Sequence, residues 1–166
     1  MDYFKLLDIE RKFDIDLKKL EQQYFALQIK YHPDKAESEV EKHHNLTISI
    51  NLNKAYTILK NNLTRAEYLL LLNGINIENL EIRKNLSKEQ LNSIWDDLEI
   101  IENTNDVATL GKFYDVKIKE KENIITNITE AFKVSNLQQA LNSTISLKYL
   151  SNLIDNIKLK LKNANN

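Results

Sequence analysis

The stretch with the clearest chemical potential is His32-Pro33-Asp34, followed by Lys35. Pro33 is the only proline of the chain; it restricts its own φ angle and disfavours the helical conformation of the residue before it. We therefore expect His32 and Asp34 to be held in a rigid, exposed turn between two helices. An exposed carboxylate there can form a charge-assisted pair with an arginine of another protein. The alternative is an ordinary interhelical turn, because proline and aspartate are common turn formers.

Other reactive side chains give no support for catalysis or metal binding. The chain has no cysteine, which excludes disulfides, thiolate zinc sites and cysteine nucleophiles. His43 and His44 are adjacent, and adjacent helical residues point about 100° apart, so both cannot face one ion. The sequence also lacks a glycine-rich phosphate loop and a nucleophile beside a plausible base. We expect no metal, no cofactor and no intrinsic enzyme activity.

A second candidate surface lies in segment 89–111, which contains no lysine or arginine. On a helix, one flank of this segment carries an aromatic and two acidic residues, with two aliphatic residues beside them: Trp95, Glu99, Glu102, Ile94 and Leu98. An apolar patch edged by carboxylates is typical of a protein-binding surface. Ile94 and Leu98 also fit the core stripe, so core and interface are equally good interpretations for them. Trp95 lies to the side of that stripe, which favours the interface.

A neighbouring surface is suggested by Ile145, Tyr149 and Leu153 in the last predicted helix. These residues form a second apolar strip, rotated away from the stripe through Leu150 and Ile154. A helix with two apolar faces either lies deep in a bundle or presents one face to a partner. The sequence leaves both alternatives open.

Helices must position these residues, and regular apolar spacing predicts three of them in the first half of the chain. The first is capped by Asp16 and ends before Pro33, the second begins near Glu41, and the third covers Leu63 to Asn73, with Gly74 just past its end. The stripe of the first helix comprises Leu17, Leu20, Tyr24, Leu27 and Tyr31, and that of the second comprises Ile48, Leu52, Ala55 and Leu59.

The second half predicts a three-helix bundle. Ser87 and Gln90 form a capping box that opens the first of these helices, and residues 103–105 interrupt the apolar pattern. The second helix carries Val107, Leu110, Tyr114, Ile118, Ile125, Ile128 and Phe132 on one face, and the third carries Leu147, Leu150, Ile154, Ile157 and Leu161.

Composition agrees with an all-α fold, because 166 residues include only 2 glycines and 1 proline. We divide the chain into a domain at 1–74, a connection at 75–86 and a second domain at 87–166. The net charge of -1 gives no field that would attract nucleic acid or an anionic membrane. No secretory signal is visible, and the longest apolar run is too short to span a bilayer. We expect a soluble, cytoplasmic protein.

The turn and its two helices resemble the J-domain family of co-chaperones, which stimulate ATP hydrolysis by DnaK-type chaperones. The resemblance rests on His32-Pro33-Asp34, on Lys35, and on the hydrophobic frame around them: Leu20, Tyr24, Leu27, Tyr31, Ala55, Tyr56 and Leu59. The opening Met1-Asp2-Tyr3-Phe4, segment 65–70 and the three-helix second half are similar to HscB-type proteins, and this likeness covers essentially the whole chain. It implies a J-domain followed by a three-helix domain.

The resemblance also implies two partners, an HscA-type chaperone ATPase and an IscU-type iron–sulfur cluster scaffold. Chaperone contacts are implied for Lys30, Tyr31, His32, Pro33, Asp34 and Lys35, and scaffold contacts for Ile94, Trp95, Leu98, Glu99, Glu102 and Tyr149. The family usually has a dense basic face on the helix before the turn. Here Lys18, Lys19 and Lys30 share that helix with Glu21, Gln22, Gln23 and Phe25. Electrostatic steering should therefore be weaker.

Two other functions compete with a dedicated co-chaperone of cluster assembly. A general J-domain protein would hold unfolded clients in broad apolar grooves, whereas a compact patch edged by acidic residues suits one folded client. A purely structural adaptor would contain a degenerate J-domain, and the intact His32-Pro33-Asp34 argues against it. We expect a monomeric co-chaperone that binds the ATPase and the scaffold.

Overall fold

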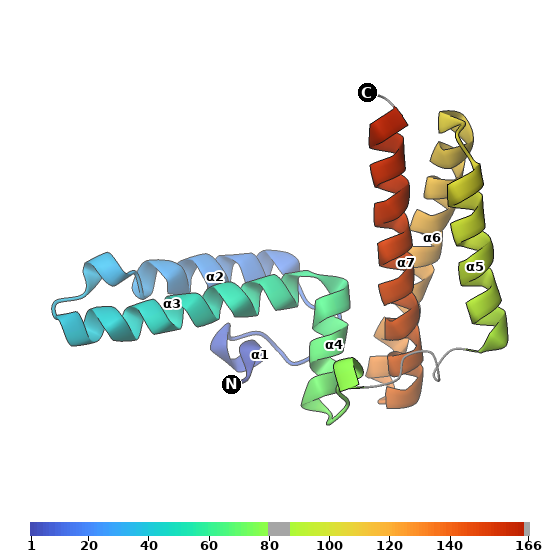
Figure 1. Ribbon diagram of the computed structural model, residues 1–166. Helices are drawn as coiled ribbons and strands as arrows, with labels where there is room; N and C mark the ends of the chain where they lie inside the picture. The colour runs from blue at the N-terminus through green and yellow to red at the C-terminus, as the bar shows by residue number, and fades with distance from the viewer. Residues whose placement is uncertain (80–86, 165–166) are drawn as a thin grey trace. The chain divides into compact units, whose positions relative to one another are not determined.

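The computed structural model describes residues 1–79 and 87–164 of the chain. Every regular element within these ranges is helical, which confirms the predicted all-α fold (Figure 1). None of the described helices has the length and apolar character needed to cross a membrane.

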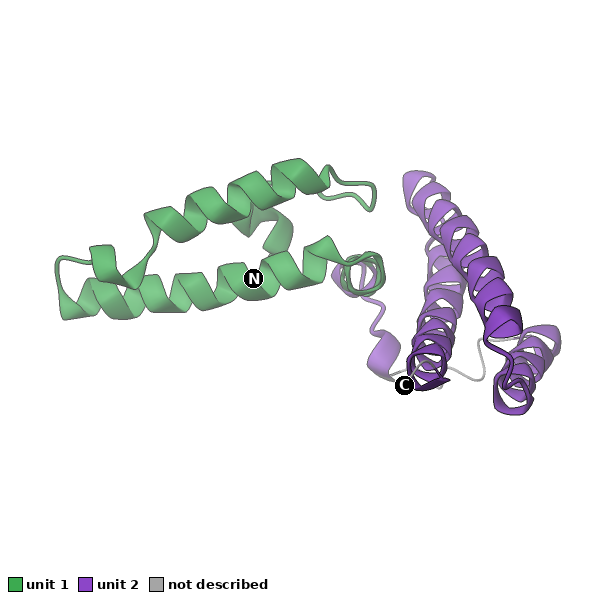
Figure 2. Ribbon diagram, turned by 90° about the horizontal axis from the view of Figure 1, so that it is seen from above, with its two compact units in different colours: residues 1–69 green, residues 70–166 purple. Residues whose placement is uncertain are grey.

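The chain divides into two compact units, Met1–Leu69 and Leu70–Asn166, which Figure 2 colours separately. The division falls inside helix α4 (Asn62–Leu72). The boundaries of 1–74, 75–86 and 87–166 stay a prediction. Residues 80–86 of the predicted connection lie outside the described residues.

The first unit is built on a helical hairpin, in which α2 (Leu17–Lys30) and α3 (Glu39–Lys60) lie side by side (Figure 1). The side chain of Asp16 accepts hydrogen bonds from the backbone of Lys18 and Lys19, as predicted for an N-cap. The structure starts α3 two residues before the predicted Glu41, because Ser38 supplies the N-cap and accepts a hydrogen bond from the Glu41 backbone at 3.2 Å.

The predicted stripes of this hairpin are largely confirmed, with Leu20, Leu52, Ala55 and Leu59 fully buried. The prediction for Leu17 is wrong, because this residue is 49% exposed in the first turn of α2, at the edge of the stripe. Short α1 (Tyr3–Leu6) also belongs to this unit, and its Phe4 is buried.

Polar side chains join the two helices along one edge of the hairpin. The rings of Tyr24 and Tyr56 stack with 4.2 Å between their centroids, and the Tyr24 hydroxyl donates to Asn53 at 2.6 Å. One turn farther, Gln28 accepts a hydrogen bond from the Ser49 hydroxyl at 2.7 Å. These contacts fix the register of the hairpin that carries the turn.

Arg65, at the start of α4, is buried at 4% exposure. Its guanidinium donates to the carbonyl oxygens of Leu59 and Lys60 and to the side chain of Asn62, and it lies over the Phe13 ring at 4.9 Å. Burial lowers the pKa of Arg65 to about 10. Because these carbonyls end α3, Arg65 caps that helix and joins it to the next one.

Gly74 ends α4 as predicted, with a φ of +83°. The Gly74 backbone N–H donates to the Leu71 carbonyl at 3.0 Å and the Ile75 N–H donates to the Leu70 carbonyl at 2.9 Å. This pair of bonds is the Schellman motif, in which a residue with positive φ satisfies the last carbonyls of a helix.

The second unit contains three long helices, α5 (Lys88–Asn103), α6 (Val107–Lys133) and α7 (Leu137–Ala164) (Figure 1). The capping box at the start of α5 is confirmed: Ser87 accepts from the Gln90 backbone, and the Gln90 side chain accepts from the Ser87 backbone. The predicted interruption at 103–105 corresponds to the turn between α5 and α6.

Two apolar clusters form the interior of this unit. One contains Leu70, Ile77, Ala131, Ala140, Leu141 and Ile145, and the other contains Ile101, Leu150, Leu153, Ile154 and Ile157. Ile145 and Leu153 are therefore core residues. Their strip is therefore buried at Ile145 and Leu153, whereas Tyr149 between them is half-buried.

Candidate functional site

The turn between α2 and α3 is a single 3-10 turn, Pro33–Lys35, with His32 as its N-cap. The His32 Nδ1 accepts a hydrogen bond from the Asp34 backbone at 3.2 Å, and the Lys35 backbone donates to the His32 carbonyl at 3.0 Å. Because Nδ1 is the acceptor, a neutral imidazole carries its proton on Nε2, where it can donate outward. Local backbone bonds thus fix the turn. We call residues 32–35 the HPD loop.

The HPD loop exposes its charged groups to solvent. The Asp34 side chain is 85% exposed, and Lys35 and His32 are also exposed. Before the loop, the Lys30 ammonium lies 5.0 Å from the centre of the Tyr31 ring, which is half-buried. The six residues predicted to contact a chaperone are therefore contiguous at one end of the hairpin, and Asp34 is available to pair with a cation.

The face of α2 before the loop has few cations. Lys18 and Lys19 are exposed as expected, but so are Phe25 at 55% and Ile29 at 61%. The exposure of Phe25 agrees with the sequence-based expectation, whereas Ile29 was not among the residues expected on the surface. Nothing in this arrangement replaces the dense basic face of typical J-domains.

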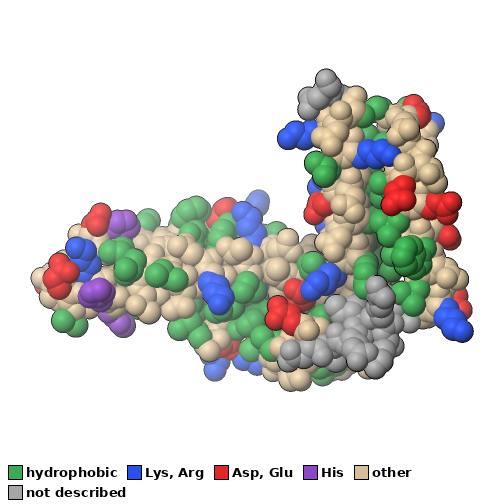
Figure 3. Space-filling view, viewed as in Figure 1, with side chains coloured by type: hydrophobic (Ala, Val, Ile, Leu, Met, Phe, Trp, Pro, Cys, Tyr) green, Lys and Arg blue, Asp and Glu red, His purple; other side chains and the backbone are tan. Residues whose placement is uncertain are grey.

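The second candidate surface lies on α5, and we call its five residues the α5 face: Ile94, Trp95, Leu98, Glu99 and Glu102. Trp95 is 67% exposed, and Glu99 and Glu102 are exposed on the same helix. Figure 3 shows apolar side chains along the seam between α7 and α5, with acidic side chains beside them on α5. This is the composition expected of a partner-binding surface.

The aliphatic residues of the α5 face divide between surface and interior. Ile94 is half-buried against the cluster around Ile145, together with Tyr149 of α7, and Leu98 is half-buried against the cluster around Ile154. Each side chain packs inward and stays partly exposed, so the structure supports a part in the core, and the interface interpretation stays a prediction. The structure brings Ile94 and Tyr149 together at the edge of a cavity.

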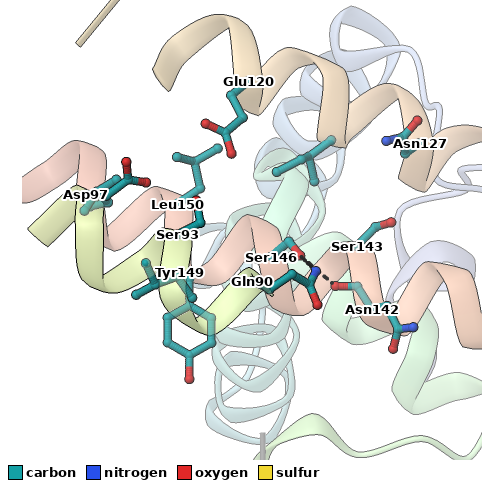
Figure 4. A pocket seen from close by; sticks show the side chains of 13 residues that line it. Gln90, Ser93, Asp97, Glu120, Asn127, Asn142, Ser143, Ser146, Tyr149 and Leu150 are labelled. Carbon is teal, nitrogen blue, oxygen red and sulfur yellow. Dashed lines mark hydrogen bonds between the residues drawn. The ribbon is translucent and has the colours of Figure 1, made fainter. Parts of the chain in front are cut away.

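That cavity, of about 360 Å³, lies among α5, α6 and α7 (Figure 4). Its lining mixes apolar side chains, such as Ile124 and Leu153, with polar side chains that include Gln90, Ser93, Asn127, Ser143 and Ser146. The Gln90 side chain donates to the Ser146 hydroxyl at 3.3 Å. Polar contacts therefore accompany the apolar packing between α5 and the other two helices here.

Two lysines that sequence reasoning did not single out as site residues hold α5 in place. Lys117 of α6 donates to Asp97 of α5 at 2.6 Å and to Glu120 at 2.9 Å. Lys160 of α7 donates to the carbonyl oxygens of Ile101 and Glu102 at the end of α5. The sequence does contain a signal for Lys117, because it falls on the apolar stripe of its helix, between Tyr114 and Ile118.

Within residues 1–79 and 87–164, no three or more histidine, aspartate or glutamate side chains converge as metal ligands. His43 and His44 are both exposed on α3.

Comparison with known proteins covers both units. Residues 2–68 match the family model described as the DnaJ domain, and residues 76–158 match the HSCB C-terminal oligomerisation domain. The chain is 32% identical to the co-chaperone protein HscB of Proteus mirabilis, over 95% of this chain and 94% of the relative. It is 33% identical to the iron-sulfur cluster co-chaperone protein HscB of Mus musculus, over 95% of this chain and 68% of the relative.

Solved structures give the same result for the fold. The crystal structure of the human co-chaperone protein HscB superposes with a TM-score of 0.90 at 30% identity, covering 96% of this chain and 82% of that one. Chaperone HscB from Vibrio cholerae superposes with a TM-score of 0.78 at 27% identity, covering 96% of each chain.

Proposed function

Because the chain belongs to the HscB family of J-domain co-chaperones, we propose that it couples an iron–sulfur cluster scaffold to a DnaK-family ATPase. In this proposal the HPD loop contacts the chaperone and the α5 face, with Tyr149, contacts the scaffold. The chain supplies no catalytic group. It raises ATP hydrolysis by binding the hydrolysis-competent state of the chaperone more tightly than its other states.

The observation that carries the proposal is the exposed, locally fixed HPD loop. Asp34 presents an 85% exposed carboxylate, while the backbone around it is held by the His32 side chain and by the 3-10 turn. A pre-formed loop loses little conformational entropy on binding. A carboxylate in this position suits a charge-assisted bond to an arginine of the chaperone.

Support for the scaffold contact comes from Trp95 and its acidic neighbours. A tryptophan that is 67% exposed is a strong anchor candidate, since interface energy concentrates in few large side chains. Glu99 and Glu102 beside it would set the association rate and its salt dependence more than the lifetime of the complex.

The test is an ATPase assay with the cognate chaperone, with and without the scaffold. We expect stimulation by the wild-type chain and further stimulation when the scaffold is present. Asp34→Asn and His32→Gln should abolish stimulation with a nearly unchanged melting temperature, because the loop contributes little to the core. Full stimulation by both variants contradicts the assignment of the loop.

The same assay tests the alternative of a general J-domain protein that holds unfolded clients, and it tests the domain division. An unfolded protein in place of the scaffold should give no further stimulation. A fragment ending near Gly74 should still stimulate the ATPase, and a fragment from about residue 86 should bind the scaffold without affecting hydrolysis. Light scattering tests the expected monomer, and it is needed because the matched C-terminal family model is described as an oligomerisation domain.

A further inference from the structure

Lys117 is a buried cation in the second unit. Its side chain is 8% exposed, and its ammonium donates to Asp97 of α5 at 2.6 Å and to Glu120 of α6 at 2.9 Å. The ammonium also lies 5.3 Å from the centre of the Phe113 ring. Asp97 itself is 15% exposed, so the bond between α5 and α6 is largely removed from solvent.

The charge of Lys117 is stabilised within this site. Burial lowers the pKa of Lys117, but the hydrogen bonds to Asp97 and Glu120 raise it by more, and the net direction is upward from 10.5. A buried pair of this kind contributes little net stability compared with apolar residues of similar volume, but removing one partner alone is costly. Its main consequence is geometric, because it sets where α5 lies against α6.

The cavity of about 360 Å³ explains why this geometry matters. Asp97 and Glu120 both line it, and opposite them the space is bounded by polar residues of α7 such as Ser146 (Figure 4). Apolar side chains of α5 such as Ile94 and Ile101 pack against the two interior clusters, but the cavity leaves part of α5 without close contacts. Polar contacts add to this packing: Lys117 with Asp97, Gln90 with Ser146, and Lys160 with the last carbonyls of α5.

Asp97 is also adjacent in sequence to the α5 face. Helical residues two positions apart point about 200° away from each other, so Trp95 and Glu99 lie on the side opposite Asp97. Any displacement of Asp97 therefore moves Trp95 and Glu99 relative to Tyr149, which is fixed on α7. We propose that Lys117 is a positioning residue, which holds the α5 face in register with Tyr149 for binding of the scaffold. This inference rests on the proposed function, because it assumes that the scaffold binds there.

The first test needs no partner. Hydrogen exchange of the full chain compares the wild type with Lys117→Met, which keeps an unbranched side chain one atom shorter and removes its charge. We expect α5 amides to exchange about 10-fold faster while α7 amides change little, since exchange reports local opening. Equal acceleration in all three helices, or none in α5, overturns the proposal, because Lys117 would then act on global stability alone.

The second test measures scaffold binding by calorimetry. Lys117→Met should weaken binding about 3- to 10-fold, the range of couplings carried through positioning elements. Lys117→Met combined with Asp97→Leu removes both buried charges, so stability should return close to wild type while binding stays weak, because the apolar pair does not set the same geometry. Wild-type affinity in either variant overturns the proposal.

Trp95→Ala in the same series distinguishes failure of the proposed scaffold site from failure of the proposed role of Lys117. If this variant binds the scaffold with wild-type affinity while α5 still exchanges faster in Lys117→Met, the scaffold site is misplaced, yet Lys117 does position α5. If Trp95→Ala binds weakly and Lys117→Met binds normally, the scaffold site stands and the role of Lys117 is wrong.

Discussion

The HPD loop and the α5 face differ in how far their residues are also used for packing. None of the four loop residues is buried, and the first unit is held together by other side chains, such as Leu20 and Leu52. On the α5 face, Ile94 and Leu98 pack into the interior of the second unit. A site in a loop can therefore change without loss of stability, whereas a site on a packed helix shares residues with the core.

This difference determines how variants are read. Loss of function in a loop variant points to the contact itself. Loss of function in an α5 variant combines weaker binding with weaker folding, so binding and unfolding must be measured on the same variants.

The largest effect is expected from Arg65→Met in the first unit. This change removes the donors to the carbonyls of Leu59 and Lys60 and to Asn62, and unsatisfied buried groups should cost about 3 kcal/mol in the free energy of unfolding. Urea unfolding followed by circular dichroism measures it. ATPase stimulation should fall with the folded fraction, while scaffold binding persists.

Arg11→Met is the matched control for Arg65. Arg11 pairs with Asp2 at the surface, and its side chain is 49% exposed. Exposed ion pairs contribute about 0 to 1 kcal/mol, so this variant should be close to wild type. If both arginine variants lose stability equally, burial does not explain the role of Arg65.

The next effect concerns binding alone. Trp95→Ala should weaken scaffold binding by about 2 kcal/mol, which is roughly thirtyfold. Because Trp95 is 67% exposed, the free energy of unfolding should change by less than about 0.5 kcal/mol. Calorimetry and parallel urea unfolding measure the two quantities. Val116→Ala provides the control, since Val116 is 58% exposed on α6, outside the α5 face.

The same variant also tests whether the α5 face has an exposed anchor residue. If Trp95→Ala unfolds the second unit yet binds the scaffold normally when folded, Trp95 belongs to the core. The α5 face would then have no exposed anchor.

Leu98→Ala should show the shared role directly. Its half-buried side chain packs against the cluster around Ile154, so truncation should cost about 1.5 kcal/mol of stability, less than for a fully buried leucine. Scaffold binding should weaken as well, by less than in Trp95→Ala. A loss in only one of the two measurements would assign Leu98 to the core or to the interface alone.

Sequence patterns predicted the parts of this molecule that depend on local rules. The HPD loop, the cap at Asp16 and the capping box at Ser87 each follow from a few neighbouring residues. Apolar spacing predicted the helices. It did not predict the exposure of Leu17, because spacing along one helix does not show how far the contact with the neighbouring helix extends.

The parts that could not be predicted depend on pairs from different helices. Lys117 and Asp97 are 20 residues apart, and no local rule joins them. Ile94 and Leu98 remained undecided because a period of 3.6 residues identifies the inward face without giving the closeness of the opposite helix. In the structure both side chains are half-buried, and Ile94 borders the cavity beside α5.

A smaller effect is expected from alkaline pH. Because the pKa of Lys117 is raised in the folded chain, the folded state holds this proton more tightly than the unfolded state. The resulting stabilisation is complete below the ordinary value of 10.5 and is lost as the pH rises through the folded value. Lys117→Met has no titratable group at this position, so it lacks this stabilisation at every pH. Urea unfolding at several pH values should therefore show the difference between wild type and variant shrinking above pH 10.5; a constant difference contradicts this.

The smallest effect is expected in the turn between α6 and α7. Ser135 has a φ of +56°, and the bonds from Ser135 to the Phe132 carbonyl and from Asn136 to the Ala131 carbonyl form a second Schellman motif. A side chain is disfavoured at this φ, so Ser135→Gly should raise the free energy of unfolding by about 0.5 kcal/mol. Gly74→Ala is the opposite substitution in the first Schellman motif. A Cβ at this position would meet no atom within 4 Å, so the expected loss of folding stability comes from the backbone conformation alone. ATPase stimulation and scaffold binding should be unchanged in Ser135→Gly. A stabilised variant with altered scaffold binding would mean that the turn between α6 and α7 is coupled to the α5 face. Packing residues of the second unit could then not be treated as separate from its contact residues.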